Sequence, residues 1–174
     1  MKALQLLKYY YHNNMCSTTK QSEFMQEAIQ LSIENVKSGK GGPFGAVIVK
    51  DGKIIARGAN GVTSTNDPTA HAEVVAIRNA CKALGSFQLD GCEIYTSCEP
   101  CPMCLGAIYW ARPDRMYFAN TKKDAADINF DDQFIYEELE LPYQNRKLET
   151  IQMMNEEALE AFKLWSENIN KIEY

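Results

Sequence analysis

The spacing of apolar residues along the chain predicts alternating helices and strands. Between residues 19 and 38 they recur every three to four positions, which is typical of an amphipathic helix. The apolar run at 47–49, the Asp51-Gly52 pair and a second apolar run predict a β-hairpin. After a polar loop, residues 71–85 again show helical spacing. Gly85 can end that helix because glycine adopts positive φ without steric cost.

The second half continues the alternation. We expect a strand at 92–97, a helix from Pro100 to about Trp110, a strand at 114–120, short helical pieces near 124–139 and a final helix near 156–170. Strands that are joined by helices are usually parallel, so this order indicates an α/β fold with a mixed sheet. We expect one domain over residues 19–174 and a leader at 1–18 to which no role is assigned.

Length and composition narrow the class of protein. The chain has 174 residues, of which 45% are apolar and 24% charged, and these values exclude a largely disordered protein. No stretch approaches the roughly 20 apolar residues of a membrane helix. The first residues also lack the apolar run of a secretory signal. We therefore expect a cytoplasmic protein without a membrane partner, in which the six cysteines are reduced.

The charge is distributed unevenly. Residues 1–120 hold 12 Lys and Arg against 10 Asp and Glu, whereas residues 121–174 hold 6 against 13. Proteins that bind nucleic acid usually concentrate positive charge on their binding surface, because neutralising phosphates supplies much of the affinity. The acidic last third is also compatible with an ordinary solvated face. In either case a small uncharged substrate fits better than RNA or DNA, and we expect no nucleic-acid partner.

Two short motifs carry the chemistry. Cys101 and Cys104 form a C-x2-C pair at a predicted helix start, where the partial positive charge favours thiolates. His71, at another helix start, can supply a third ligand. Three protein ligands leave the fourth position of zinc open to water, which is typical of a catalytic site. Glu73 can lie beside that water, accept its proton and return it to a leaving group.

Simpler interpretations of these residues exist. A lone C-x2-C pair is often a structural metal staple, and an isolated histidine is more often an ordinary core or surface residue. Cys98 forms a second C-x2-C pair with Cys101. If Cys98 also bound zinc, the site would have four ligands and would be closed to water. A non-catalytic zinc module would give no role to Glu73.

Taken together, the motifs resemble the cytidine-deaminase-like zinc superfamily. The order H-x-E…P-C-x-x-C is the signature of zinc nucleobase deaminases. The stretches GGPFGAVIV, TAHAEVVAIRNA and YTSCEPCPMCLGAIYWARP are similar to its purine-acting branch, the bacterial guanine deaminases. The likeness continues through FDDQFIY and the ending Asn170–Tyr174, and it covers nearly everything from about residue 20. It implies a three-layer α/β/α fold around a central mixed five-stranded sheet.

The resemblance also implies the site. The family uses the two cysteines after Pro100, so Cys98 is expected to be a nearby thiol rather than a ligand. The implied roles are one Zn²⁺ per chain on His71, Cys101 and Cys104, catalysis by Glu73 and Asp132, and base contacts from Asn60, Phe44, Trp110 and Tyr174.

The residues alone leave alternatives for the base contacts. Asn60 is equally well a turn residue in Ala-Asn-Gly. Phe44 and Trp110 could simply pack in the core. Asp132 could belong to a solvated acidic loop or cap a helix.

The C-terminal segment, about 156–174, is expected to pair chains. In similar guanine deaminases it crosses to the partner and covers its pocket. Trp165, Ile169, Ile172 and Tyr174 give it an apolar side here, so we expect a domain-swapped homodimer in which Tyr174 approaches the other chain's site. An ordinary helix packed on its own subunit is the alternative.

The implied activity is zinc-dependent hydrolysis of a free purine base, guanine to xanthine and ammonia, in purine catabolism. Asp132 would hold or help to protonate the leaving amine. A tRNA adenosine deaminase, which also resembles the chain around the two motifs, is the first alternative. A deaminase of cytosine or of a triazine is the second.

Overall fold

The computed structural model describes the backbone of residues 2–130 and 132–174, and side chains from residue 19 onward except at 131. The chain divides into two compact units, Met1–Asp132 and Gln133–Tyr174. The expectation of one domain over 19–174 stays a prediction.

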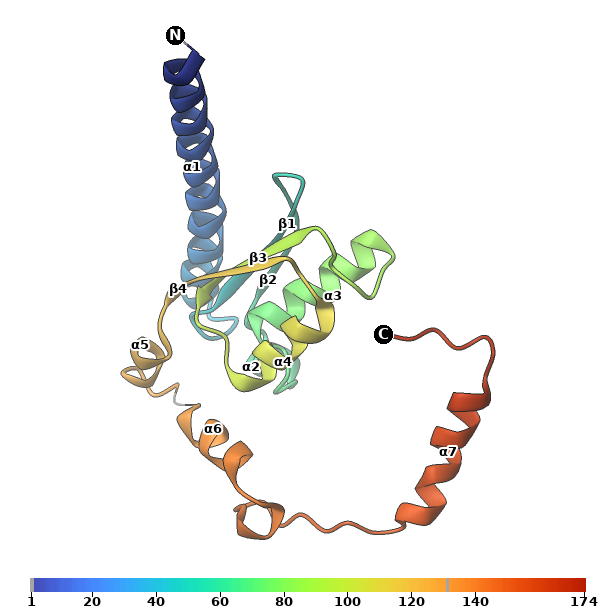
Figure 1. Ribbon diagram of the computed structural model, residues 1–174. Coiled ribbons are helices and arrows are strands. Elements are labelled where there is room, and N and C mark those ends of the chain that lie inside the picture. Colours follow the sequence, from blue (N-terminus) through green and yellow to red (C-terminus); the bar gives the residue numbers. More distant parts are fainter. Residues whose placement is uncertain (1, 131) are drawn as a thin grey trace. The chain divides into compact units, whose positions relative to one another are not determined.

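The first unit alternates helices and strands (Figure 1). Its elements are α1 (Lys2–Lys37), β1 (Gly45–Lys50), β2 (Lys53–Ala59), α2 (Val62–Thr65), α3 (Ala72–Leu84), β3 (Cys92–Cys98), α4 (Pro102–Ala111), β4 (Arg115–Asn120) and α5 (Lys122–Ala126).

The strands form one mixed sheet in the order β2-β1-β3-β4. The pairs β1–β2 and β1–β3 are antiparallel, whereas β3 and β4 are parallel, as expected for strands joined by a helix. The resemblance implied a sheet of five strands, and this is wrong: the described residues form four. After β4 the chain turns into helix at once: Thr121 caps α5, accepting a hydrogen bond from the Asp124 N–H and donating to its carboxylate.

Helices cover both faces of this sheet. Alternate residues of β1 point to opposite sides. Val47 and Val49 pack with Ala28 of α1, whereas Ile48 packs with Ala76 of α3 and with Ile108 of α4. In Figure 1, α3 and α4 lie on the same side of the sheet. The first unit therefore has the three layers that the resemblance implies.

Several boundaries differ from the expectation. α1 starts at Lys2 rather than near residue 19, so it crosses the end of the predicted leader. The polar loop after β2 contains the short helix α2. α4 starts at Pro102 rather than Pro100, because Cys101 has extended backbone and occupies the N-cap position. The hairpin, and α3 with its left-handed cap at Gly85, are confirmed.

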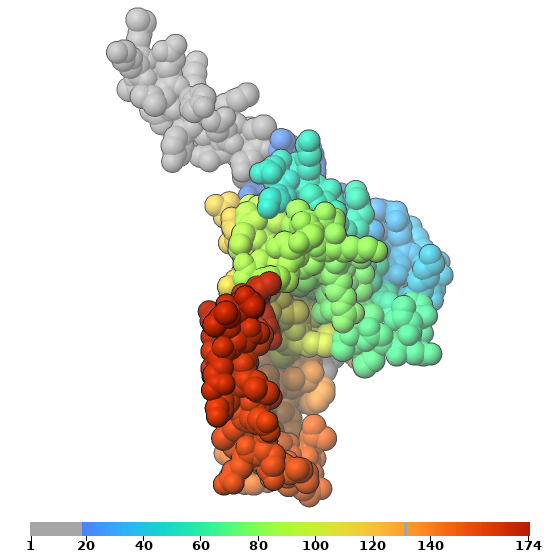
Figure 2. All heavy atoms as spheres, turned by 90° about the vertical axis from the view of Figure 1, so that its right-hand side faces the viewer, coloured from blue at the N-terminus to red at the C-terminus, as the bar shows by residue number. Residues whose placement is uncertain are grey.

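The second unit consists of α6 (Gln133–Glu140), the 3₁₀ turn Tyr143–Asn145 and α7 (Asn155–Glu167). The predicted final helix is present but ends three residues earlier than 170. None of these elements has a buried residue. The side chains of this unit are coloured orange to red in Figure 2. Its apolar side chains thus do not form a core among themselves.

Across the described part of the chain, every helix is too short or too polar to span a bilayer.

Candidate active site

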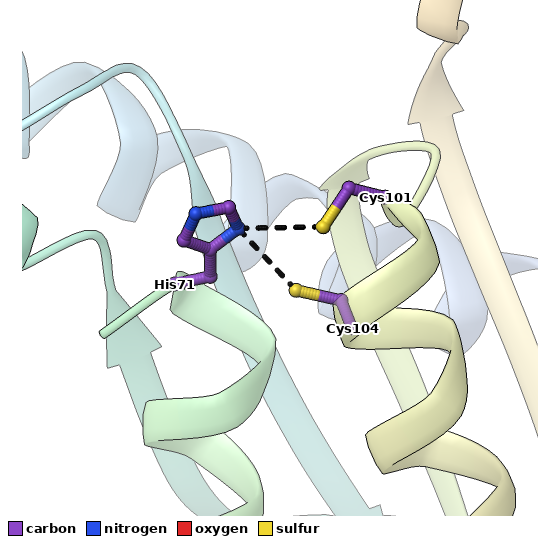
Figure 3. Close-up of side chains that lie close together, drawn as sticks. All are labelled: His71, Cys101 and Cys104. Carbon is purple, nitrogen blue, oxygen red and sulfur yellow. Dashed lines mark hydrogen bonds between the residues drawn. The ribbon is translucent and has the colours of Figure 1, made fainter. Parts of the chain in front are cut away.

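Three side chains from two helix starts converge on one point (Figure 3). His71 is the N-cap of α3, Cys101 is the N-cap of α4, and Cys104 lies in the first turn of α4. The His71 Nδ1 atom lies 3.6 Å from the Cys101 sulfur and 3.4 Å from the Cys104 sulfur. All three ligand atoms lie within 4.8 Å of one another.

Tight packing of the hairpin on α3 helps to place this cluster. A Cβ at Gly58 of β2 would collide with the backbone of Ala72 and Ala76, so only glycine lets the strand approach the first turns of α3 this closely. On the other side, β3 ends at Cys98, three residues before Cys101. Both ligand-bearing helix starts are therefore held at one end of the sheet.

The cluster fits zinc. Zinc binds cysteine sulfur at about 2.3 Å and histidine nitrogen at about 2.0–2.1 Å, so a tetrahedral site places N and S about 3.6 Å apart. The two N–S distances of 3.6 and 3.4 Å agree with this value. Two sulfurs and one imidazole also form the mixed donor set that zinc prefers. Three ligands leave a fourth position for a small molecule.

Cys98 is not part of the cluster. Its buried thiol donates to the carbonyl of Thr121 at 3.6 Å, and the three-residue cluster found among the described side chains does not include it. Burial raises the pKa of Cys98 to about 11, so it stays a neutral thiol. This arrangement favours the open, three-ligand interpretation.

The pKa values of the two cluster cysteines are shifted in opposite directions. The hydrogen bond from Cys104, and then that from His71, lower the pKa of Cys101 to about 4. The same bond to Cys101, followed by burial, raises the pKa of Cys104. The hydrogen bond to Cys101 also raises the pKa of His71, with smaller contributions from the charges of Glu73 and Asp132. Cys101 is thus a ready thiolate ligand.

Glu73 lies beside the cluster on α3 and is 5% exposed. The Cys104 sulfur lies 3.5 Å from one carboxylate oxygen, and the Thr96 hydroxyl lies 3.3 Å from the other. Burial is the main cause that raises the pKa of Glu73. A raised pKa makes the carboxylate a stronger proton acceptor, which is what a general base needs.

A cavity of about 410 Å³ opens onto these groups. His71, Glu73 and Cys101 lie at its wall, and Phe44 and Asn60 line it as well. The cavity is therefore large enough and apolar enough for a flat ring, with a few polar groups to orient it.

Asn60 has a fixed orientation at the cavity wall. Its side-chain oxygen accepts hydrogen bonds from the N–H groups of Gly42, at 3.2 Å, and Val62, at 3.3 Å. Its backbone oxygen accepts from the Asn35 amide at 2.8 Å. Two N–H donors on the oxygen decide the orientation of the amide and leave its NH₂ group as the part that can face a ligand.

Of the other three predicted site residues, only Asp132 lies at the cavity wall. Asp132 lines the cavity and is close enough to influence His71. Trp110 is 64% exposed near the end of α4 and is absent from the cavity wall, so it neither packs in the core nor lines the pocket of its own chain. Tyr174 belongs to the second unit and is exposed.

Some cavity residues were not anticipated from the sequence. Phe130 stacks edge-on against Phe44, with ring centres 5.0 Å apart, and so closes one wall. Its place within Phe-Asp-Asp was the signal that could have identified it. The remaining unanticipated lining residues are Gly42, Val62, Thr63, Glu99, Lys122, Ala125 and Asn129.

Comparison with known proteins shows which family shares this arrangement. Residues 18–120 match the model of the cytidine and deoxycytidylate deaminase zinc-binding region. Guanine deaminase from Bacillus subtilis is 58% identical over 151 residues, which are 87% of this chain and 97% of that protein. Its crystal structure superposes with a TM-score of 0.86 at 57% identity, over 88% of this chain and 98% of that one.

More distant relatives match a smaller part. A tRNA-specific adenosine deaminase from Agrobacterium fabrum is 51% identical over 76 residues, which are 44% of this chain and 50% of that protein. The structure of guanine deaminase from Nitrosomonas europaea has a TM-score of 0.60 and 34% identity, over 63% of each chain.

The layered fold and the His-Cys-Cys cluster define a zinc-binding deaminase domain. The chain belongs to the family of cytidine and deoxycytidylate deaminases that share this zinc-binding region.

Proposed function

We propose that this chain is a guanine deaminase, a zinc-dependent hydrolase that converts guanine and water to xanthine and ammonia. The observation that supports this proposal most strongly is how much of each relative the sequence match covers. The match to the Bacillus subtilis guanine deaminase spans 97% of that protein, whereas the match to the Agrobacterium tRNA deaminase spans half of that one. The correspondence to the guanine deaminase therefore includes the segment beyond the zinc motifs.

His71, Cys101 and Cys104 would hold the zinc. When bound, zinc acts as a Lewis acid and makes water a stronger nucleophile at neutral pH. The remaining steps belong to the chain. Glu73 accepts a proton from the attacking water and later gives it to the amine that leaves C2 of guanine. Its burial beside the cluster supports this role, because burial raises the pKa of its carboxyl and so makes the carboxylate a stronger proton acceptor.

Asn60 and Phe44 orient the base. The O6 and N7 atoms of guanine are both hydrogen-bond acceptors, whereas adenine presents an amino group in place of O6. The Asn60 NH₂ group, whose oxygen is already held by backbone, matches an acceptor edge. The Phe44–Phe130 wall provides an apolar surface for the ring.

Asp132 is assigned to the leaving amine. It lies at the cavity wall with the other polar groups, and a carboxylate can accept hydrogen bonds from an amino group. Asp132 therefore holds the exocyclic amine while the tetrahedral carbon forms, and helps it to leave as ammonia.

The active enzyme is a homodimer that exchanges C-terminal segments. Support comes from the uncovered apolar surface of the second unit: Phe162 is 74% exposed and α7 has no buried residue. Tyr109 and Trp110 of α4 are exposed apolar groups as well and offer an interface. In this dimer Tyr174 approaches the pocket of the partner, excludes water and blocks polynucleotides. A cytoplasmic location is part of the proposal, because reduced thiols are needed to hold the metal.

A panel of substrates with metal analysis tests the proposal. Purified protein is assayed for ammonia release from guanine, adenine, cytosine, cytidine, a triazine and a tRNA anticodon stem-loop. Guanine should react fastest, with about one zinc per chain. Faster release from cytosine or a triazine would replace the assigned base, and zinc without any release would indicate a non-catalytic module.

A further inference from the structure

The loop between β3 and α4 is hydrogen-bonded to the start of α5. The Glu99 N–H donates to the carbonyl of Asn120 at 2.8 Å, and the Glu99 carboxylate accepts from the Lys122 N–H at 3.0 Å. The Cys98 thiol adds a weaker bond to the Thr121 carbonyl at 3.6 Å. Two consecutive residues therefore attach the α5 start to the end of β3.

α5 does not need Glu99 for its own cap. The Thr121 N–H and hydroxyl donate to the Asp124 carboxylate at 2.8 and 2.7 Å, and the Asp124 N–H donates to the Thr121 hydroxyl at 3.3 Å. This reciprocal capping box pairs the N–H groups of Thr121 and Asp124 within α5 itself. The bond from Lys122 to Glu99 thus docks the helix rather than forming it.

The docked segment is one wall of the cavity. The segment that begins at the Glu99 bond lines the pocket through Lys122, Ala125 and Phe130. Phe130 also packs on Phe44. On the other side of Glu99, Cys101 lies two residues away in the metal cluster. Glu99 therefore lies between the metal cluster and the start of the base wall, and its carboxylate is bonded to that wall.

We propose that Glu99 is a positioning residue that sets the width of the base pocket by holding the start of α5. The substrate named in this inference rests on the proposed function, whereas the hydrogen bonds that it uses do not. A misplaced wall weakens binding of the base more than it changes the chemistry at Glu73. The Michaelis constant is thus the sensitive quantity.

Glu99→Ala and Glu99→Gln test the role. A glutamine oxygen can still accept the Lys122 N–H, whereas alanine cannot. With the base of the panel that reacts best, Glu99→Ala should raise KM about tenfold with kcat changed less than about threefold. Glu99→Gln should stay within about twofold of the unchanged protein in both, and both variants should keep their zinc.

Thr121→Ala is the matched control. It removes the α5 capping box and keeps the Glu99 bond, so it should leave KM within about twofold. An equal rise in KM for Thr121→Ala would mean that helix stability, not docking, is responsible, and would overturn the proposal. A glutamine variant as impaired as the alanine variant, or an alanine variant with unchanged KM, would overturn it as well.

Amide hydrogen exchange separates this inference from the proposed function. The Lys122 amide should exchange faster in Glu99→Ala than in Glu99→Gln, whichever base is the substrate. Failure of the unchanged protein to act on guanine would count against the proposed function alone. Equal exchange at Lys122 in both variants would contradict the docking role directly.

Discussion

The two units of the chain use their apolar residues in different ways. In the first, Val47, Ile48 and Val49 are almost completely buried between helices on both faces of the sheet. In the second, Phe162 and Ile169 are 74% and 95% exposed, although the apolar periodicity of α7 is clear. An apolar pattern thus identifies the face that needs a partner, but it does not identify the partner. In the first unit the partner is the sheet; for the second we propose another copy of the chain.

The largest expected effect is in the first unit. Cys101→Ala removes one of three zinc ligands and leaves a site with two, so zinc should fall from about one per chain to near zero and guanine turnover should be lost. Metal analysis and ammonia release measure this. Cys98→Ala is the matched control and should retain its zinc; a zinc-free Cys98→Ala protein would refute the ligand assignment.

Glu73→Gln should have the next largest effect. The side chain keeps its shape but no longer accepts the proton of water, so kcat for guanine should fall at least about 10²-fold while zinc stays bound. Steady-state kinetics with metal analysis check both parts. Near-normal turnover would remove Glu73 from the mechanism.

Deleting residues 168–174 tests whether the second unit contributes to the site. The proposal expects guanine turnover to fall at least about tenfold, because the pocket loses a cover that excludes water, while the first unit keeps its zinc. Full activity in the truncated chain, or in a monomer at assay concentration, would show that the tail is independent of the site.

A single exposed side chain gives the smallest and most specific test. Ile169→Ala should lower guanine turnover about threefold through a weakened dimer, with little change in the stability of the first unit. Leu148→Ala, also exposed but outside the predicted swapped segment, is the matched control. Equal losses in both variants, or no loss in either, would count against an exchanged segment at 156–174.

Local signals made much of the first unit predictable. Asp51-Gly52 indicated the hairpin and Gly85 the end of α3, because each constrains the backbone within a few residues. The motif spacing anticipated the cluster of His71, Cys101 and Cys104, since both helix starts lie at the same end of the sheet.

Features that depend on tertiary packing were less predictable. α4 is apolar on nearly all sides, so periodicity could not indicate that Trp110 is exposed. The fifth strand came from the resemblance alone and is absent from the described residues, whereas the short helical pieces expected near 124–139 are present as α5 and α6. Glu99 and Phe130 line the cavity through contacts with distant segments; the Phe-Asp-Asp motif pointed to Phe130, but no local pattern marks Glu99.

The specificity for a free base over RNA is the most direct test of the central claim. We would measure kcat/KM for guanine and for adenosine in a tRNA anticodon stem-loop with the same preparation at low and high salt. The account predicts turnover of guanine with weak salt dependence, since no phosphates are neutralised, and no reaction of the RNA. Faster, strongly salt-dependent deamination of the RNA adenosine would contradict it.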